Sequence, residues 1–587
     1  MDRAINQKGL VYPMLREAIL HIPMSPYAHG VDERHILFRL RAARGDLSSC
    51  TLYYGDRACR QNPVIFTAAP MAVTASDELY DYYEVIIDSP YKRVCYYFEL
   101  SDGKTTLLFY ADIFTNEHAE ERSEYFQLPF NHRDDIADIP GWIKNAVVYN
   151  IFPDSFASGS ESIAGKAKSA PFKALTTHSL LGGTLRGVTE SLPYLEELGI
   201  NCIYLNPIFA AEEYHKYDLL DYYHIDPCFG TNEDFKALVE ACHARGMRVI
   251  IDGVFNHCGW RFFAFEDVVQ NGENSRYRDW FYGLTFPVVR PDTGEEYPSY
   301  DCFAYERKMP KLNTANPEVV AYFCDVCRYW IREYDIDGWR LDVANEVNFG
   351  FWRAFRSAAK DVKPDCVLIG EVWESALPWL RGDVFDSTMN YDLRKFSRDF
   401  FALSKLDAYQ FNARVTAMRM RYNRNMLYGQ LNLLDSHDVL RFLSACKENE
   451  ARFRAAAVFQ MTFIGVPSIF YGDETGIVGI KESEYRRPMR WDNTRGPLFD
   501  FYQKLIALRR GSPALREGNF KTLYAQTGGG LYAYERTAAG NTVTVFLNAS
   551  DVTETVPSRL LPQGKDPVIA TGLSNGQLAP WGYAIYR

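Results

Sequence analysis

Acidic side chains stand at the ends of four separate apolar runs of this 587-residue chain. Each run is short, as in a buried strand, and each carboxylate falls at or just beyond its carboxyl end. Like charges that gather in one place cost stability unless they serve a purpose, so the pattern favours a catalytic role over a structural one. The four are Asp252 in RVIIDGVF, Asp342 in DGWRLDV, Glu371 in VLIGEVW and Asp438 after LNLLDS.

This set of side chains suits the hydrolysis of a glycosidic bond. That reaction needs one ionised carboxylate as nucleophile and one protonated carboxyl that releases the leaving oxygen. Arg340 precedes Asp342 by two residues, so both point to the same side of a strand, and the guanidinium is expected to keep Asp342 ionised. The negative charge around Glu371 is expected to keep that carboxyl protonated. A retaining mechanism requires the two carboxyl groups to lie roughly 5–5.5 Å apart.

The elements that would position these groups are eight apolar runs from residue 143 onward. They alternate with helical stretches, which predicts βα units, and eight such units favour a closed (β/α)8 barrel whose strand carboxyl ends meet at one face. Between two of the runs, Thr231 and Asp234 have the spacing of a capping box, and Gly246 is expected to end that helix. The runs are NAVVYNIF, NCIYLNPIF, RVIIDGVF, DGWRLDV, VLIGEVW, DSTMNY, LNLLDS and SIFYG.

The fold class expected for the whole chain is a multidomain α/β protein. Residues 1–125 are rich in aromatic and β-branched runs between turns, which predicts an N-terminal β-sandwich. A linker over residues 126–142 leads to a catalytic barrel over 143–512, whose connection after the third strand, 258–316, is long enough to form a loop domain. Residues 513–587 return to a β pattern and predict a C-terminal β-sandwich.

Composition limits the class of protein and of partner. The formal net charge of −11 argues against nucleic acid or an anionic membrane as partner, because phosphates are bound by clustered Lys and Arg. Cys324 and Cys327 form the only CxxC among twelve cysteines, which predicts packing thiols and not a zinc or redox site. Neither a signal peptide nor a run of membrane-spanning length is present, so we expect a reduced, cytoplasmic protein.

Six segments, in order, resemble the sequence markers of the alpha-amylase family of glycoside hydrolases. DGVFNH, GWRLDVANE, GEVW and LLDSHD match its four main conserved regions, MPKLN at residues 309–313 is similar to a fifth, and GVPSIFYGDETG to the marker of the eighth strand. The DVANE and MPKLN forms resemble the cyclomaltodextrinase, maltogenic amylase and neopullulanase branch, and the N-terminal sandwich resembles that branch's starch-binding-type module. One marker alone would be weak evidence, whereas the ordered set covers essentially the whole chain.

The resemblance implies a role for each candidate residue. Asp342 corresponds to the nucleophile, Glu371 to the general acid/base and Asp438 to a stabiliser of the transition state. Tyr149 is expected as a stacking platform beneath the sugar. The other substrate-binding residues implied are Asp252, Asn256, His257, Arg340, Glu346, Trp373, His437, His215, Tyr217 and Phe286, with Asp218, Asp221 and Tyr222 lining or supporting the cleft.

Some of these residues also have a plain structural explanation. Asp252 could brace the site from behind, and Tyr149 could belong to the apolar core of the barrel. Trp373 and Phe286 fit packing as well as they fit substrate binding. His215 fits a supporting role better than direct chemistry.

The chain departs from the family at the first strand and in the loop that follows. YNIFPDSF stands where the branch has YQIFPDRF, and ASGSESIAGKAKSA, residues 157–170, lacks the Asp and Asn residues that bind calcium in relatives. Calcium takes six to eight oxygen ligands, and Ser and Gly supply few good ones. We therefore expect no calcium in this loop and no required cofactor, with a calcium site elsewhere left open.

Two rival functions share this scaffold. A transferase or isomerase would pass the glycosyl group to another sugar by the same chemistry, whereas a non-catalytic binding protein would have lost Asp342 or Glu371, and both are present. The resemblance implies α-glucan substrates with α-1,4 bonds, namely cyclodextrins, pullulan and short maltooligosaccharides, and it leaves cleavage of α-1,6 bonds open. It also implies a homodimer in which the N-terminal module covers the partner's cleft. The sequence does not rank these substrates, because such preferences depend on small differences in the cleft.

Overall fold

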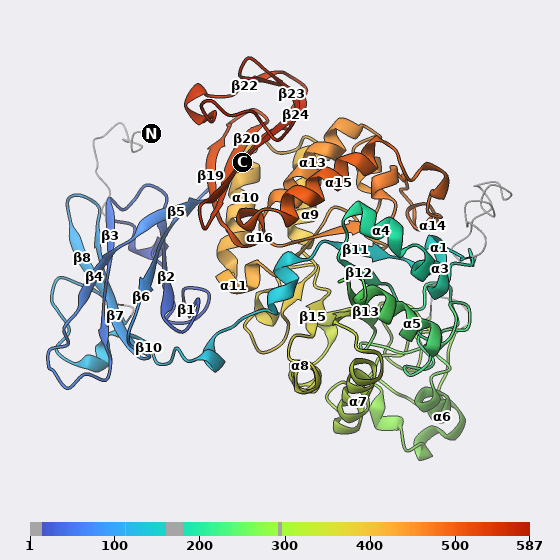
Figure 1. Ribbon diagram of the computed structural model, residues 1–587. Coiled ribbons are helices and arrows are strands. Elements are labelled where there is room, and N and C mark those ends of the chain that lie inside the picture. The colour runs from blue at the N-terminus through green and yellow to red at the C-terminus, as the bar shows by residue number, and fades with distance from the viewer. Residues whose placement is uncertain (1–13, 112, 160–179, 292–295) are drawn as a thin grey trace.

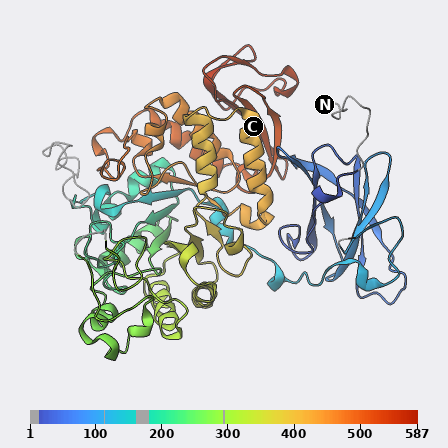
Figure 2. The same ribbon diagram turned by 180° about the vertical axis from the view of Figure 1, so that it is seen from behind.

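The computed structural model describes residues 14–111, 113–159, 180–291 and 296–587. Figure 1 shows an N-terminal β domain at the left, a barrel surrounded by helices at the right, and a C-terminal β domain above them. Figure 2 shows the same arrangement from behind, with one extended linker running from the N-terminal domain into the barrel. No helix in the described segments combines the length and the apolar character that crossing a bilayer demands.

The N-terminal domain is a sandwich of two antiparallel sheets, as predicted. Its strands are β1 (Ala28–Gly30), β2 (His35–Ala43), β3 (Ser49–Asp56), β4 (Thr67–Pro70), β5 (Ala72–Ser76), β6 (Tyr80–Asp88), β7 (Val94–Ser101), β8 (Thr106–Tyr110), β9 (Ile113–Thr115) and β10 (Phe126–Leu128). One sheet has the order β1-β2-β6-β5 and the other β4-β3-β7-β8-β9. Because β10 pairs with β7, the domain extends to Leu128, beyond the expected boundary at residue 125.

Eight parallel strands form the central sheet, and each lies in one of the eight apolar runs. They are β11 (Val148–Ile151), β12 (Cys202–Leu205), β13 (Arg248–Gly253), β14 (Gly338–Leu341), β15 (Val367–Gly370), β16 (Ser387–Thr388), β17 (Leu431–Leu433) and β18 (Val466–Phe470). Their order is β16-β15-β14-β13-β12-β11-β18-β17, and a parallel bridge between Met389 and Leu431 joins the two ends. The sheet is therefore closed into the predicted barrel.

Helices cover the outside of the barrel and return the chain between strands. They are α1 (Pro153–Phe156), α3 (Leu185–Glu190), α4 (Leu192–Leu198), α5 (Asn232–His243), α7 (Pro317–Tyr334), α8 (Phe349–Val362), α9 (Tyr391–Ser397), α10 (Ala408–Arg421), α11 (Arg424–Leu427), α12 (Phe442–Ala445), α13 (Glu450–Thr462), α14 (Glu482–Tyr485) and α15 (Pro497–Arg510). The capping box of α5 is confirmed, because Thr231 and Asp234 each accept a hydrogen bond from the other's backbone N–H. That helix ends at His243, one turn before Gly246, which lies at φ +68°.

The long connection after β13 forms the predicted loop domain. It contains helix α6 (Phe263–Asn271) and returns to the barrel through the segment 309–313. There, antiparallel bridges join His257 to Lys311 and Cys302 to Pro310, and the Leu312 amide donates to Asn256 O at 3.0 Å. The loop domain is thereby held against the carboxyl end of β13.

The C-terminal domain follows α16 (Pro513–Glu517) and begins at Asn519, a few residues after the expected boundary. Its strands form one hydrogen-bonded antiparallel sheet with a small core of its own. Along one strand, Tyr532 and Tyr534 face the barrel core, while Leu531 and Ala533 face the domain's own core. The strands are β19 (Asn519–Ala525), β20 (Leu531–Ala538), β21 (Asn541–Asn548), β22 (Glu554–Thr555), β23 (Ile569–Ser574) and β24 (Gln577–Tyr586).

Candidate active site

A cleft lies at the carboxyl ends of the barrel strands, and it gathers most of the residues that the sequence singled out. It encloses about 470 Å³, a size typical of small-ligand sites. Asp342 follows β14, Glu371 follows β15 and Asp438 follows β17, so three strands each supply one acidic group. The cleft is lined by His215, Tyr217, His257, Phe303, Met309, Asp342, Val343, Asn345, Glu346, Glu371, Trp373, Asp438, Glu482 and Arg486.

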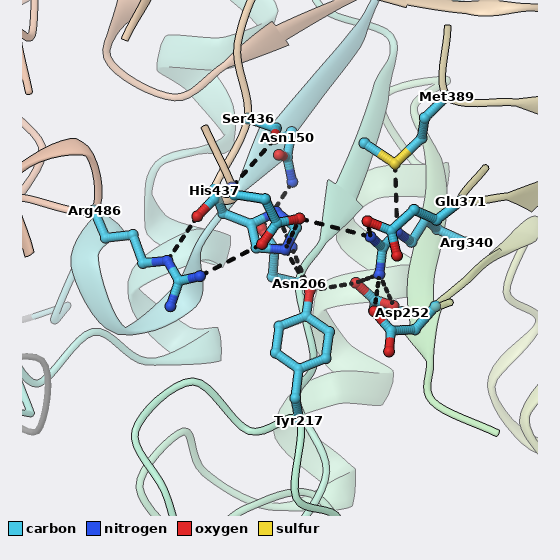
Figure 3. Close-up of polar contacts among 12 residues, drawn as sticks. Asn150, Asn206, Tyr217, Asp252, Arg340, Glu371, Met389, Ser436, His437 and Arg486 are labelled. Atoms are coloured by element: carbon cyan, nitrogen blue, oxygen red, sulfur yellow. Dashed lines mark hydrogen bonds and ion pairs between the residues drawn. The ribbon is translucent and has the colours of Figure 1, made fainter. Parts of the chain in front are cut away.

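Arg340 is the centre of the acidic cluster, as Figure 3 shows. Its Nη1 lies 2.8 Å from Asp342 Oδ1 and 2.9 Å from Asp252 Oδ1, and its Nη2 lies 2.9 Å from Glu371 Oε1. The sequence spacing predicted the contact with Asp342 and not the other two. Asp252 meets Arg340 because the two residues are partners in the register of β13 and β14. One buried guanidinium therefore holds both of the carboxylates proposed for chemistry.

Burial and mutual repulsion raise the pKa of three carboxyl groups in this cluster, those of Asp252, Asp342 and Asp438. Burial raises the pKa of Asp342 and of Asp252, and Arg340 opposes the rise in both. Burial, with Glu371 nearby, raises the pKa of Asp438 to about 7, against the opposing charges of Arg486 and Arg340. The cluster thus places more carboxyl groups around Arg340 than its single positive charge can balance.

The raised pKa of Asp438 predicts how stability depends on pH. The folded state holds this proton up to about pH 7, whereas an unfolded Asp releases it near pH ~4, so raising the pH through this window destabilises the folded state. Asp438→Asn removes the titration, and we expect its advantage over the native chain to grow by about 2–3 kcal/mol between pH 5 and pH 8. Melting curves of both proteins at the two pH values measure this difference.

A matched control is Asp325→Asn on α7, whose exposed carboxylate pairs with Arg328 at 3.0 Å. The difference in melting temperature between Asp325→Asn and the native chain should not grow between pH 5 and pH 8. The prediction is contradicted if the stability of Asp438→Asn relative to the native chain is the same at both pH values, or if it is smaller at pH 8.

Two contacts position the Glu371 carboxyl. The Val343 amide donates to Glu371 Oε2 at 3.0 Å, and Trp373 Nε1 donates to Glu371 Oε1 at 3.0 Å. Val343 has φ +44° and ψ +44°, a conformation that a β-branched residue rarely adopts. That strained turn directs the amide next to Asp342 toward Glu371. Trp373 is itself stacked on Tyr391 at 4.0 Å between ring centroids, which holds the indole in place.

His257 lines the cleft with a buried ring. Asn256 Nδ2 lies 3.3 Å from His257 Nδ1, so the ring proton resides on Nε2, which is a buried atom, and the ring also interacts with the backbone of Tyr217. Burial lowers the pKa of His257 to about 3, so the ring is neutral. Lys311 in turn binds Asn256 Oδ1 and the backbone oxygen of Glu346, the latter at 3.1 Å. A lysine of the loop domain thus connects the two walls of the cleft.

His437 and Tyr217 form the opposite wall. Asn206 Nδ2 lies 2.9 Å from His437 Nδ1, and His437 Nε2 lies 3.0 Å from Asp438 Oδ2. The Tyr217 ring is parallel to the His437 ring at a centroid distance of 5.6 Å, and its hydroxyl donates to Asp252 Oδ2 at 3.1 Å. Tyr217 lines the cleft while His437 is fully buried behind it. Tyr217 therefore presents an aromatic ring to the cleft.

The prediction for Tyr149 is wrong. Its side chain is fully buried, and its hydroxyl donates to Glu474 Oε1 at 2.7 Å, an atom that Tyr194 of α4 also contacts. Tyr149 therefore points from β11 toward the helix layer and not toward the cleft. The tyrosine that lines the cleft is Tyr217.

The prediction for Phe286 is also not supported by its position. Phe286 packs beside Gly272 at the end of α6, and it is not among the residues that line the cleft. The aromatic residue that the loop domain contributes is Phe303, which stacks on His257 at 4.9 Å.

Several predicted residues support the cleft without lining it. Asp218 is buried and accepts the Glu213 amide at 3.1 Å, and Asp221 accepts the Tyr223 amide at 2.7 Å. Tyr222 is fully buried against Phe323. Asp252, Asn256, Arg340 and His437 are likewise buried behind the surface of the cleft, where they hold the residues that face it.

Arg486 is the main site residue that sequence reasoning missed. It comes from the end of α14, donates from Nε to the His437 carbonyl at 2.7 Å, and places Nη2 3.5 Å from Asp438 Oδ1. Glu482 pairs with it one helical turn earlier at 2.5 Å. The only sequence signal was the charged run ESEYRR, which reads equally well as a solvated face. The other cleft residues absent from the predicted set were Phe303, Met309, Val343, Asn345 and Glu482.

The described residues contain no group of three or more His, Cys, Asp or Glu side chains arranged to hold a metal ion. The calcium prediction concerned residues 157–170, most of which lie outside the described residues. The twelve cysteines are all free thiols, and Cys324 and Cys327 are buried on α7.

Comparison with known proteins gives a consistent result. The family described as the alpha amylase catalytic domain matches residues 150–496, and the alpha amylase N-terminal ig-like domain matches residues 14–132. Neopullulanase 2 of Thermoactinomyces vulgaris is 44% identical over 92% of each chain. A cyclomaltodextrinase of Geobacillus thermopakistaniensis is 40% identical over 98% of this chain and 99% of its own. A solved cyclomaltodextrinase structure superposes with a TM-score of 0.89 at 36% identity, covering 97% of this chain and all of the other.

Proposed function

Because the chain belongs to the alpha-amylase family and is a glycoside hydrolase, we propose that it cleaves α-1,4 and α-1,6 glucosidic bonds with retention of configuration. The substrates proposed are cyclodextrins, pullulan and short maltooligosaccharides, by analogy with relatives named cyclomaltodextrinase and neopullulanase. The observation that carries the mechanism is the pair of carboxylates, Asp342 and Glu371, held on one guanidinium at the floor of the cleft.

The first step forms a covalent glycosyl-enzyme. Asp342 Oδ attacks the anomeric carbon while the bond to the leaving oxygen breaks, and Glu371 gives its proton to that oxygen. In the second step Glu371 takes a proton from water, whose oxygen displaces Asp342 from the anomeric carbon. Two displacements at one carbon restore the original configuration. Glu371 begins and ends the cycle protonated.

The walls of the cleft bind and distort the reacting sugar. Tyr217 supplies the stacking face, His257 Nε2 donates to a sugar hydroxyl, and Asp438 accepts from hydroxyls that approach it as positive charge develops. Trp373 and Glu346 lie on the side of Glu371 and are assigned to the leaving sugar. Support for these assignments comes from the fact that these residues line one cavity.

A substrate panel tests the proposal. Initial rates on α-, β- and γ-cyclodextrin, pullulan, maltotriose and soluble starch should exceed those of Asp342→Asn on the same substrates, with small cyclic and linear substrates ahead of starch. Proton NMR of the first product should show the α-anomer. A β-anomer would establish inversion and reject the double displacement.

Transfer to a sugar in place of water is the second candidate, since the glycosyl-enzyme is common to both reactions. The openness of the cleft beside Trp373, whose side chain is 48% exposed, favours entry of an acceptor sugar as well as water. Product analysis with and without added glucose or maltose distinguishes hydrolysis from transfer.

Lys311 is expected to matter for catalysis although it does not line the cleft. Lys311→Met removes the ammonium that binds Asn256 and the Glu346 carbonyl, so the donor at His257 and the rim at Glu346 lose their support. We expect kcat/KM to fall by about 10- to 100-fold, the usual cost of a small misplacement. Steady-state kinetics on β-cyclodextrin measure the change.

A control variant and a double variant distinguish a positioning role of Lys311 from a general loss of structure. Lys308→Met lies in the same segment, where its ammonium pairs with Glu213 and not with Asn256, and it should retain most activity. If Lys311 acts through His257, Lys311→Met and His257→Ala should combine less than additively. Fully additive losses would show that Lys311 acts by another route.

We also propose a homodimer and a cytoplasmic location. Large exposed apolar side chains on the N-terminal domain, among them Ile65 at 68% and Leu79 at 65% exposure, support an interface there. A relative named intracellular maltogenic amylase, from Bacillus subtilis, and the free thiols support the location. Gel filtration with light scattering tests the dimer, and a monomer that attacks starch faster than cyclodextrin would reject it.

Catalysis is proposed to need no metal, because every group in the two displacements is a side chain. Dialysis against EDTA should leave kcat on β-cyclodextrin unchanged, and a loss that added calcium restores would reject this proposal.

A further inference from the structure

A second cavity lies where the three parts of the molecule meet, well away from the catalytic cleft. It encloses about 430 Å³ and is bounded by β2, β5 and β6 of the N-terminal domain, by α10 and α11, and by β19 of the C-terminal domain. Figure 1 shows these elements side by side at the centre of the molecule, and contacts between β5 and both α10 and β19 agree. Nothing in the proposed hydrolysis uses this space.

The charges around this cavity do not balance. Its only acidic residue, Glu84, is occupied, because it accepts from Arg39 Nε at 2.7 Å and from Thr74 Oγ1 at 2.7 Å. Three further cations line the cavity, and none of them has an ion-pair partner among the described residues. They are Arg419, Arg424 and Lys521.

Arg419 is the most telling of the three. It is 7% exposed, and among the described residues its guanidinium makes a single, long hydrogen bond, from Nη2 to Phe520 O at 3.4 Å. Its Nε is buried without an acceptor. The guanidinium also lies over the Phe520 ring, 4.4 Å from the ring centroid, and burial lowers the pKa of Arg419. A buried cation with unused donors beside an open cavity is the natural complement of an anion.

The other walls indicate what kind of anion fits. Arg424 donates to Asn519 Oδ1 at 2.7 Å and keeps further donors free, while Lys521 is exposed at the rim. Val73 and Ile86, which are 48% and 44% exposed, form an apolar wall on which the ring of an organic molecule can lie. Three cations suit a doubly charged phosphate better than a single carboxylate, and the apolar wall adds contact area for its organic part.

We propose that this junction is a binding site for a small organic phosphate, such as the phosphomonoester of a hexose. The ligand would contact Arg419 and Arg424 of the barrel helices and Lys521 of the C-terminal domain, against the sheet of the N-terminal domain. Its binding would hold the three parts in one arrangement. The site binds its ligand independently of glucan hydrolysis, because it shares no residue with the cleft.

Binding to the full chain tests the proposal by calorimetry and by thermal shift at constant ionic strength. The probes are glucose 1-phosphate, glucose 6-phosphate, inorganic phosphate and free glucose, with sodium chloride as the salt-matched blank. We expect the hexose phosphates to bind with one site per chain and to raise the melting temperature by about 2 °C at saturation. Inorganic phosphate should bind at least 10-fold more weakly, and glucose should not bind here.

Substitutions of residues that line this cavity test whether the ligand binds there. Lys521→Met and Arg424→Gln should each weaken hexose phosphate binding at least 10-fold while kcat on β-cyclodextrin stays unchanged. Lys236→Met, which removes the same charge from the exposed face of α5, should bind as the native chain does. Equal shifts with hexose phosphate and sodium chloride, equal binding of free glucose, or undiminished binding in both rim variants would each overturn the proposal.

Discussion

Asp342→Asn is expected to lower kcat/KM on β-cyclodextrin by about 10⁴- to 10⁶-fold, the range seen when a nucleophile is removed. The amide keeps the size of the side chain but cannot form the glycosyl-enzyme by attack on the anomeric carbon. The variant should still bind substrate, because the stacking face of Tyr217 and the donor at His257 are unaltered. Steady-state kinetics and a binding titration with the same variant measure the two effects separately.

The control for this substitution is Asp383→Asn at the protein surface, where the carboxylate pairs with Arg353 at 2.7 Å. It changes the same atoms and should leave kcat/KM within a factor of two of the native value. Mass spectrometry after reaction with a 2-deoxy-2-fluoro glycosyl fluoride should place the covalent adduct on Asp342. An adduct on another residue, or full turnover by Asp342→Asn, would reject its assignment as nucleophile.

The barrel could be predicted from sequence because its signal is local and repeated. Each strand is a short apolar run, each helix has an amphipathic pattern or a cap, and their alternation restricts the topology to parallel strands. Closure places every strand's carboxyl end at one face, so the meeting of Asp342, Glu371 and Asp438 followed from topology without any coordinate. The domain boundaries were less well predicted, because β10 returns to its sheet after an irregular stretch.

The error at Tyr149 has a physical cause. NAVVYNIF is apolar on both faces, as a strand covered by helices on the outside and side chains on the inside must be. Its sequence therefore shows no polar alternation from which to decide which residues face the barrel axis. The structure settles the direction through Glu474, a residue more than three hundred positions away that accepts the Tyr149 hydroxyl.

The missed residues share a different cause. Arg486 and Phe303 reach the cleft from the loop after β18 and from the loop domain, where no regular period indicates which side chain turns inward. The contact between Arg340 and Asp252 depends on the register between two strands, which no spacing within either strand reveals. Sequence reasoning thus found the residues that follow the barrel strands or match the family, and it missed Arg486 and Phe303, which neither pattern indicates.

Glu371→Gln should affect the formation and the hydrolysis of the glycosyl-enzyme differently, depending on the leaving group. With β-cyclodextrin, whose leaving group needs a proton, we expect kcat/KM to fall by about 10²- to 10⁴-fold, the usual contribution of general acid catalysis. With α-maltosyl fluoride, whose leaving group needs little assistance, the first step should proceed and the glycosyl-enzyme should accumulate, because no base activates water. A burst of fluoride followed by slow turnover is the expected signature, measured by stopped-flow or a fluoride electrode.

Added azide shows which carboxylate is the nucleophile and which is the acid/base, because azide attacks the anomeric carbon without needing a base. In Glu371→Gln it should restore turnover and yield α-maltosyl azide, since it displaces Asp342 from the intermediate. In Asp342→Ala it could act only by direct displacement and would yield the β-azide. Glu374→Gln, which alters a neighbouring glutamate that accepts from Asn345 at 3.3 Å, should show no burst and no dependence on azide. If Glu371→Gln instead gave the β-azide, the roles of Asp342 and Glu371 would be reversed, and the contact of Arg340 with both carboxylates would have to stabilise the opposite assignment.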